Sequence, residues 1–173
     1  MQRYRNGRIV IQEGDITKCA VDALVSPANP SLSPTPQGLD GAISRAAGPE
    51  LEVALRNLGG CEPGQAKATP GFKLAAQLVI HAVAPTWQGG GRDEDQLLEN
   101  TYESALRLAL EHDVRSVAIP PLGARFPKDR AAQIAIASAL DFQEQHPSIE
   151  QVTFCCATPE DLAIYQMAAS EYL

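Results

Sequence analysis

Apolar residues are spaced along the chain in two different patterns. Short, almost wholly apolar runs are separated by longer stretches in which apolar positions recur every three to four residues, and these patterns predict strands and helices respectively. Runs that are apolar throughout are typical of central strands covered on both faces. The predicted strands are residues 8–12, 23–26, 66–69, 78–83, 116–119 and 151–156.

The longer stretches each carry one apolar face. Within residues 93–112, the side chains of Leu98, Tyr102 and Leu106 lie on the same side of a helix, and Glu99 turns to water. This spacing is a packing pattern and carries no functional message. The predicted helices are residues 41–58, 93–112, 128–145 and 159–172.

Cap signals and connections complete the expected fold. Asp40 precedes the first helix, and Thr158 precedes Pro159 at the start of the last, where short polar side chains accept hydrogen bonds from free backbone N–H groups. No internal repeat and no long linker divides the chain. We therefore predict a single α/β domain over residues 1–173, with a mixed sheet sandwiched between helices.

Charge and composition limit the partners. The 14 Lys and Arg residues against 21 Asp and Glu leave a net charge of −7, which opposes general nucleic-acid binding but not a small nucleotide held by backbone N–H groups. No apolar run approaches the ~20 residues of a membrane helix, and the first residues lack the apolar core of a signal peptide. The four cysteines and three histidines show no metal-ligand spacing. We expect a cytoplasmic monomer with free thiols, no metal and no membrane contact.

The segment from Gly14 to Thr17 directly follows the first predicted strand. An ionised Asp15 only accepts hydrogen bonds, so it suits the exocyclic amine of an adenine while the backbone after it pairs with the ring edge. The same side chain also suits the N-cap of a one-turn helix. The tetrapeptide alone does not decide between these two roles.

Asn29 and Asp40 flank a proline-rich loop, residues 27–38, that joins a strand to a helix. In α/β sheets such loops border the ligand site. Asn29 can fix a ribose hydroxyl and Asp40 can hold or activate a water, whereas a turn-forming Asn and an N-capping Asp are simpler roles for the same residues. The helix beginning near Gly41 would point free N–H groups into this cleft, which favours a diphosphate.

A second loop, residues 120–127, follows another buried strand and would face the first loop. Its Arg125 can bind phosphate oxygens through two N–H groups, or simply be solvated. Three other features have structural explanations. His81 sits in an apolar run, the Gly89 to Gly91 segment lacks the Lys and Ser/Thr of a phosphate-binding loop, and Cys61 has no histidine nearby in sequence.

Taken together, these segments resemble the macrodomain family over nearly the whole chain. The resemblance rests on the order in which the segments occur. The first matches are Gly14–Thr17, Ala28 with Asn29, and Leu39–Ile43. The matching continues downstream to the last strand. The downstream segments are Leu58–Cys61, Gly64–Thr69, Val79–Trp87 and Phe154–Cys156 with the tail to Tyr165.

The resemblance implies a three-layer α/β/α fold with an ADP-ribose cleft at the strand ends. It implies a role at each matched position: Asp15 for adenine, the Ile16 N–H beside it, Asn29 for the distal ribose and Asp40 for the catalytic water. In family members that are hydrolases, this Asn and Asp support cleavage of ADP-ribose from acidic side chains or of O-acetyl-ADP-ribose, with no cofactor or metal. The expected partner is ADP-ribose or an ADP-ribosylated protein.

The two loops depart from the family's pattern. The family's N-A-A-N is Ser26–Asn29 here, and only Gly38 is retained from a glycine-rich loop whose replacement by prolines removes N–H donors. The second loop is shortened, and we expect Arg125 to replace missing phosphate-binding amides and Phe126 to form a wall over the distal ribose. The ligand-binding residues expected in and beside the loops are Gly38, Gly41, Gly123, Ala124, Arg125 and Phe126.

The leading hypothesis is an ADP-ribosyl hydrolase or O-acetyl-ADP-ribose deacetylase in which Asp40 positions water and Asn29 orients the ribose. The altered loops keep two alternatives open. One is a non-catalytic ADP-ribose reader, and the other is a diverged macrodomain that binds another nucleotide or a protein.

Overall fold

The computed structural model describes residues 1–173 and contains one seven-stranded sheet. The order across the sheet is β1-β2-β7-β6-β3-β5-β4. The edge strands β1 and β4 run antiparallel to their neighbours, and the five central strands are parallel to one another, which confirms a mixed sheet. The strands are β1 (Gln2–Tyr4), β2 (Ile9–Glu13), β3 (Ala23–Pro27), β4 (Ala66–Pro70), β5 (Leu78–Ala82), β6 (Ser116–Ile119) and β7 (Gln151–Cys156).

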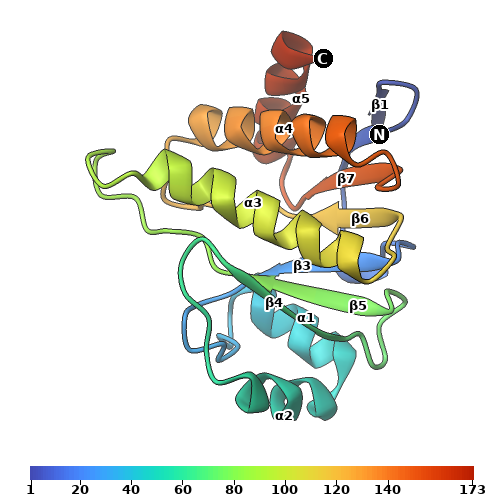
Figure 1. Ribbon diagram of the computed structural model, residues 1–173, viewed down its shortest axis with the longest axis vertical. Coiled ribbons are helices and arrows are strands. Elements are labelled where there is room, and N and C mark those ends of the chain that lie inside the picture. Colours follow the sequence, from blue (N-terminus) through green and yellow to red (C-terminus); the bar gives the residue numbers. More distant parts are fainter.

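Helices cover both faces of this sheet, so the predicted three-layer α/β/α fold is confirmed (Figure 1). On β3, the neighbours Leu24 and Val25 point to opposite faces, as alternation along a strand requires. Val25 belongs to the larger apolar cluster with α3, α4 and α5, and Leu24 to the smaller one with α1 and α2. The helices are α1 (Leu39–Ala47), α2 (Pro49–Leu58), α3 (Glu94–Glu111), α4 (Lys128–Gln145) and α5 (Pro159–Tyr172), with a short 3-10 turn η1 (Ile16–Lys18) after β2.

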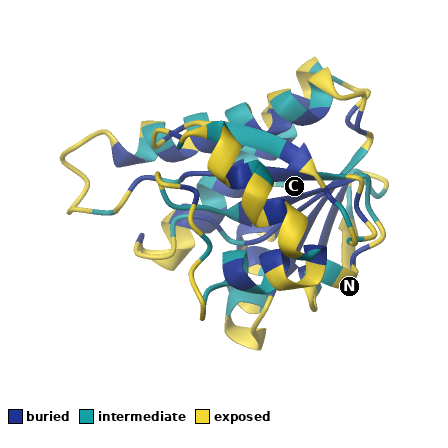
Figure 2. Ribbon diagram, turned by 90° about the horizontal axis from the view of Figure 1, so that it is seen from below, coloured by how far each residue is buried: buried dark blue, intermediate teal, exposed yellow.

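Burial follows the layers. The central strands lie almost wholly inside, and the helices turn exposed residues outward (Figure 2). His81 on β5 is buried, as expected for a core histidine, and its Nε2 lies 2.9 Å from the hydroxyl oxygen of Thr69. Burial lowers the pKa of His81 to about 4, so the ring is neutral at physiological pH. No helix combines the length and apolarity needed to cross a membrane.

The helix expected over residues 41–58 is wrong, because the structure has two helices there. Gly48 adopts φ 96° and ψ 174°, and Pro49 begins α2. A proline disfavours the helical conformation of the residue before it but is well suited to the first position of a new helix. The chain therefore turns at Gly48 and restarts at Pro49.

Two further expectations about local structure also change. Asp40 does not precede the first helix: Gly38 is the N-cap of α1, and Asp40 lies in the first turn, where a carboxylate still favours the positive end of the helix dipole. The strand β1 was not predicted, because its three residues are mostly exposed and carry no apolar run. The expected Thr158 cap is confirmed, with its hydroxyl accepting from the Asp161 N–H at 3.1 Å.

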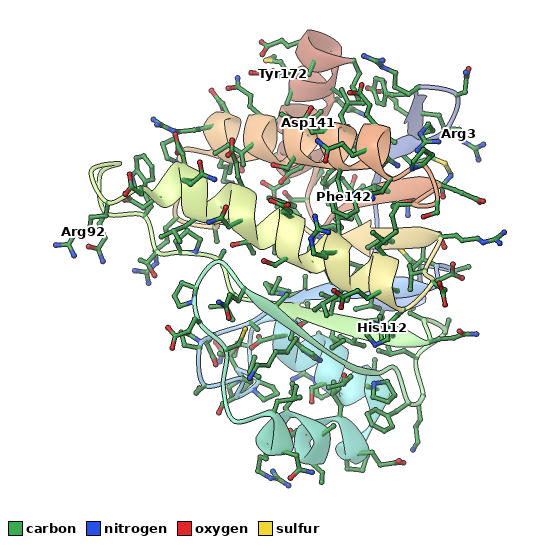
Figure 3. The ribbon with its side chains drawn as sticks, viewed as in Figure 1. Arg3, Arg92, His112, Asp141, Phe142 and Tyr172 are labelled. Atoms are coloured by element: carbon green, nitrogen blue, oxygen red, sulfur yellow. The ribbon has the colours of Figure 1, made fainter.

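The loop between β5 and α3 is built around one carboxylate. Glu94 accepts hydrogen bonds from the backbone N–H groups of Gln88 at 2.6 Å, Gly90 at 3.1 Å and Arg92 at 2.7 Å. These bonds lower the pKa of Glu94 to about 2. Arg92 lies at the tip of this loop, on the far left of Figure 3, with its guanidinium in solvent. The Gly89–Gly91 segment therefore wraps an internal anion, the carboxylate of Glu94.

Because the folded-state pKa of Glu94 lies below its ordinary value of 4.5, its ionised form stabilises the fold. This contribution is complete above about pH 5 and is lost as the pH falls through 4.5 toward 2. We predict that Glu94→Gln lowers the midpoint of thermal unfolding by several degrees at pH 7, and that the gap to wild type narrows below pH 4.5. Circular-dichroism melts from pH 7 to pH 3 measure both. Glu99→Gln, which removes an exposed carboxylate from the same helix, should leave the midpoint unchanged, and an equal effect in both variants would contradict the account.

Candidate functional site

A cleft of about 930 Å³ lies along one edge of the sheet. The five parallel strands all end there, and each sends the chain into its wall: Asp15 follows β2, Ala28 follows β3, Ala84 follows β5, Pro121 follows β6 and Ala157 follows β7. The carboxyl edge of a parallel sheet is where α/β proteins bind ligands, because the backbone groups leaving the strands are free there. The volume suits a dinucleotide-sized ligand.

Three helices begin at this cleft. Leu39 of α1, Lys128 of α4 and Asp161 of α5 all line it. The N-termini of α1 and α4 have no side-chain cap, so their first N–H groups point outward without a partner from the protein. Two uncapped helix N-termini give the cleft an electropositive wall suited to a diphosphate, although the whole chain is acidic.

Asp15 and Ile16 lie together in the cleft wall, as the sequence suggested. One carboxylate oxygen of Asp15 accepts from the N–H of Thr17 at 3.0 Å and from its hydroxyl at 2.7 Å, which lowers the pKa of Asp15. The cap role is thus confirmed, and the second carboxylate oxygen stays free for an external donor. The Ile16 N–H has no partner within the protein. An acceptor beside a free donor matches the edge of an adenine.

The second loop also reaches the cleft. Gly123, Ala124 and Arg125 line it, and none of their three backbone N–H groups is bonded within the protein. Arg125 is exposed and forms no ion pair, so its guanidinium is available to a ligand. Phe126 is placed differently: it is 3% exposed, packs on Trp87 with ring centroids 5.0 Å apart, and does not line the cleft.

Asn29 and Asp40 meet in a small recess of about 10 Å³ that adjoins the cleft at Ala28, which lines both. The recess has room for about one water molecule. His81 and Ser26 contribute to its wall. The structure thus brings the two candidate catalytic side chains together, beside the cleft and not on its main wall.

Both side chains also hold the proline-rich loop in place. Asn29 donates to the carbonyl of Ser33 at 2.8 Å and accepts from its N–H at 3.1 Å. The carboxylate of Asp40 accepts from the N–H of Thr35 at 2.9 Å and from its hydroxyl at 2.6 Å. Arg45 adds a third tie to the carbonyl of Pro36 at 2.9 Å. We call Ser33 to Pro36 with these ties the strap.

Gly38 and Gly41 lie behind the strap and do not line the cleft. A Cβ on Gly41 would lie 1.9 Å from the carbonyl oxygen of Thr35, and one on Gly38 would lie 2.2 Å from the Thr35 hydroxyl oxygen. Both glycines therefore let the strap approach the start of α1. These two glycines influence the shape of a ligand site through the strap, and they do not line the cleft themselves.

Sequence reasoning missed three residues of the site. Thr35 bonds Asp40, and Lys128 and Asp161 form an ion pair at the cleft with 3.4 Å between Nζ and Oδ1. For Lys128 and Asp161 a signal existed, because each lies in the first turn of a predicted helix that follows a buried strand. Thr35 carried no such signal among the surrounding prolines.

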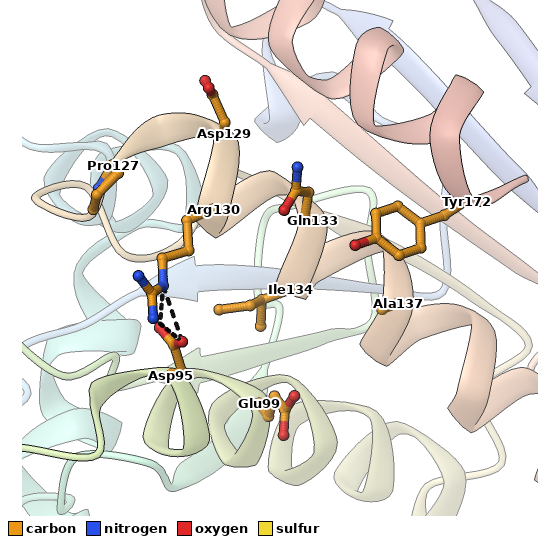
Figure 4. Close-up of a pocket in the computed structure, with 9 residues that line it drawn as sticks. All are labelled: Asp95, Glu99, Pro127, Asp129, Arg130, Gln133, Ile134, Ala137 and Tyr172. Atoms are coloured by element: carbon orange, nitrogen blue, oxygen red, sulfur yellow. Dashed lines mark hydrogen bonds and ion pairs between the residues drawn. The ribbon is translucent and has the colours of Figure 1, made fainter. Parts of the chain in front are cut away.

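A second hollow, of about 590 Å³, lies on the outer surface between α3, α4 and the end of α5 (Figure 4). Arg130 occupies its rim, pairs with Asp95 through two nitrogens and stacks over Trp87 at 5.2 Å. Its charged lining consists of three carboxylates and Arg130, and it contains none of the predicted site residues.

The three-layer fold and the cleft at the strand ends together define the class of this protein. It is an α/β/α domain with a nucleotide-sized site at the carboxyl edge of its sheet.

Comparison with known proteins identifies the family. The family model described as macro domain matches residues 25–135. A macro domain-containing protein of Mesorhizobium japonicum is 47% identical over 166 residues, covering 94% of each chain. An O-acetyl-ADP-ribose deacetylase of Cronobacter sakazakii is 42% identical over 174 residues, covering 96% of each chain. The chain belongs to the macro domain family.

Solved structures agree with this assignment. The Oceanobacillus iheyensis macrodomain with ADP superimposes with a TM-score of 0.88 at 31% identity, covering 94% of this chain and 90% of that one. The Trypanosoma brucei macrodomain in complex with ADP-ribose has a TM-score of 0.85 at 30% identity, covering 94% of this chain and 69% of that one. One of these two structural neighbours thus holds ADP and the other holds ADP-ribose.

The close approach of the strap to Gly41 can be tested by adding one methyl group. In a helix, alanine is favoured over glycine by about 1 kcal/mol. We predict the opposite for Gly41→Ala, a loss of about 1–3 kcal/mol in the free energy of unfolding, because the methyl group would collide with the Thr35 carbonyl. Urea denaturation measures this. Gly91→Ala, whose added Cβ meets nothing within 4 Å, is the control, and a stabilised Gly41→Ala variant would contradict the packing described.

Proposed function

We propose that the chain binds ADP-ribose in the 930 Å³ cleft and hydrolyses esters of its distal ribose, either ADP-ribose joined to an acidic side chain or O-acetyl-ADP-ribose. The observation that carries the proposal is the meeting of Asn29 and Asp40 in one recess beside the cleft. The relatives named O-acetyl-ADP-ribose deacetylase, at 41–44% identity, support the same chemistry.

The proposed binding mode uses the free groups of the cleft. Adenine meets the open oxygen of Asp15 and the N–H of Ile16. The diphosphate lies against the first N–H groups of α1 and the N–H groups of the shortened second loop, where Arg125 adds a charge that can bond two oxygens. The distal ribose then reaches Ala28 and the recess beyond it.

The proposed reaction needs one water and one carboxylate. On ADP-ribose joined to an acidic side chain, water held in the recess by Asp40 attacks the anomeric carbon, the bond from that carbon to the ester oxygen breaks, and the side-chain carboxylate leaves with the electron pair. On O-acetyl-ADP-ribose, the water attacks the acetyl carbonyl carbon, the bond from that carbon to the ribose oxygen breaks, the ribose oxygen leaves as a hydroxyl with one proton of the water, and acetate is released. The proton released by the water passes to Asp40. Asn29, which offers both a donor and an acceptor, orients the ribose hydroxyls. For this to happen Asp40 must exchange the Thr35 hydroxyl for the water.

The bonds within the strap also favour a second candidate, a reader that binds ADP-ribose without cleaving it. Each carboxylate oxygen of Asp40 already accepts one hydrogen bond from Thr35, and both polar atoms of Asn29 bond the backbone of Ser33. A wild-type protein that binds ADP-ribose but releases none from a mono-ADP-ribosylated protein would establish the reader.

Replacing one carboxylate oxygen of Asp40 with an amide nitrogen distinguishes hydrolysis of the ADP-ribosyl ester from binding of ADP-ribose. We predict that Asp40→Asn lowers the rate of ADP-ribose release from a mono-ADP-ribosylated acidic side chain by about 100-fold or more, since general-base contributions reach that size. Its Kd for ADP-ribose, from titration calorimetry, should change by less than about threefold. Asp141→Asn, an exposed carboxylate on α4 that lies outside the cleft, is the matched control (Figure 3). Undiminished release by Asp40→Asn would refute the catalytic role.

The contribution of Arg125 to binding is testable on its own. A hydrogen bond to a charged group contributes about 1.5–3 kcal/mol, and the exposure of Arg125 argues for the lower end. We predict that Arg125→Ala raises the Kd for ADP-ribose by about tenfold. Arg92→Ala removes the same charge from the tip of the β5–α3 loop and should leave the Kd unchanged. If the two variants bind equally tightly, Arg125 does not contact the diphosphate.

A further inference from the structure

Two thiols meet directly beneath the expected adenine end of the cleft. Cys19 ends the turn η1, Cys155 is the penultimate residue of β7, and their sulfur atoms are 3.9 Å apart. Cys19 is 9% exposed and Cys155 is 3% exposed, yet Cys155 lines the cleft. The other two cysteines form no sulfur–sulfur contact with them, because Cys156 faces the opposite side of the sheet and the Cys61 thiol donates its hydrogen bond to the Glu62 carbonyl.

The two sulfurs have different surroundings. The contact with Cys155, together with a hydrogen bond from Nε2 of Gln12 at 3.6 Å, lowers the pKa of Cys19. The same contact with Cys19, together with burial, raises the pKa of Cys155. Cys19 is therefore the more easily ionised of the two thiols, and Cys155 stays protonated next to it. This is the pairing of an attacking and a resolving thiol.

The thiols are tied to the ligand-binding turn. The Cys155 thiol donates to the carbonyl of Gly14, with 3.4 Å between sulfur and oxygen, and the Cys19 sulfur lies 4.0 Å from the carbonyl oxygen of Asp15. Asp15 and Cys19 are the residues at the two ends of the turn η1. A movement of Cys19 toward β7 therefore displaces the segment that carries Asp15 and the free N–H of Ile16.

We propose that Cys19 and Cys155 are a modification site, which hydrogen peroxide converts to a disulfide that weakens binding of the adenine moiety. The Cys19 thiolate attacks one peroxide oxygen, the O–O bond breaks, and the departing hydroxide takes up a proton as the first water. The sulfur of Cys155 then attacks the Cys19 sulfenic acid, the S–O bond breaks, and the oxygen leaves with the Cys155 proton as the second water. The two thiols lose two electrons, which reduce one peroxide to two waters.

Formation of the bond requires the sulfurs to approach from 3.9 Å to about 2.05 Å. The approach removes the S–H donor to Gly14 and displaces Cys19, so Asp15 and Ile16 leave the positions that match an adenine edge. The loss of ADP-ribose affinity rests on the proposed function. Because coupling between sites is reciprocal, bound ADP-ribose disfavours the disulfide by the same factor.

Peptide mapping of the peroxide-treated wild-type protein under non-reducing conditions tests the bond itself. We expect the intact protein to lose two hydrogen atoms, with a cross-linked peptide that joins Cys19 to Cys155. Cys19→Ala and Cys155→Ala should lose none, while Cys61→Ala and Cys156→Ala should behave as wild type. Absence of this cross-link in the wild type, or the same oxidation in Cys19→Ala, would overturn the proposal, and the wild-type map is decisive even if a variant fails to fold.

Titration calorimetry with ADP-ribose tests the consequence. We expect the oxidised wild type to bind at least about fivefold more weakly than the reduced protein, with full recovery in dithiothreitol, and Cys19→Ala to be insensitive to peroxide. A mapped disulfide with unchanged affinity would refute the coupling. Reduced protein that binds no ADP-ribose while still forming the disulfide would instead refute the proposed function and leave the thiol site standing.

Discussion

Five parallel strands end at one edge of the sheet, and their backbone groups cannot be satisfied by further strand pairing there. The chain leaves β2, β3, β5, β6 and β7 in loops, and three helices begin beside those loops. Free N–H groups, two uncapped helix N-termini and the carboxylate of Asp15 therefore converge without any special arrangement of side chains. The nucleotide-sized cleft is a consequence of strand direction, and the loops only adjust it.

The strap is the part of the site in which this chain differs from a glycine-rich loop. Prolines cannot donate hydrogen bonds and cannot fold closely around a ligand, so the loop is held by side chains at its two ends. Asn29 fixes Ser33 and Asp40 fixes Thr35, while Gly41 leaves space for the Thr35 carbonyl. The two residues for which we propose a catalytic role thus also have a structural one, and the bonds that hold the strap must open before Asp40 can hold a water.

Much of this architecture could be predicted from sequence. The apolar runs predicted the five parallel strands, because buried parallel strands need apolar residues on both faces, and residues 66–69 were also predicted correctly as a strand, the antiparallel edge strand β4. The position of Asp15 after β2 placed it in the cleft. The break at Gly48 was missed because apolar spacing continues across it, although Pro49 was the available signal. The bond from Thr35 to Asp40, the Cys19–Cys155 contact and the burial of Phe126 against Trp87 depend on how distant segments pack, which spacing along the chain does not record.

The central claim is that the distal ribose of bound ADP-ribose reaches the recess of Asn29 and Asp40 past Ala28. A crystal structure of the complex with ADP-ribose tests it most directly. The account predicts a distal ribose hydroxyl within about 3.2 Å of Asn29, with the Asp40 carboxylate turned from the Thr35 hydroxyl toward the sugar or a water beside it. A complex in which Asp40 still holds Thr35 and the distal ribose lies away from the mouth of the recess, out of hydrogen-bond reach of Asn29, would contradict it.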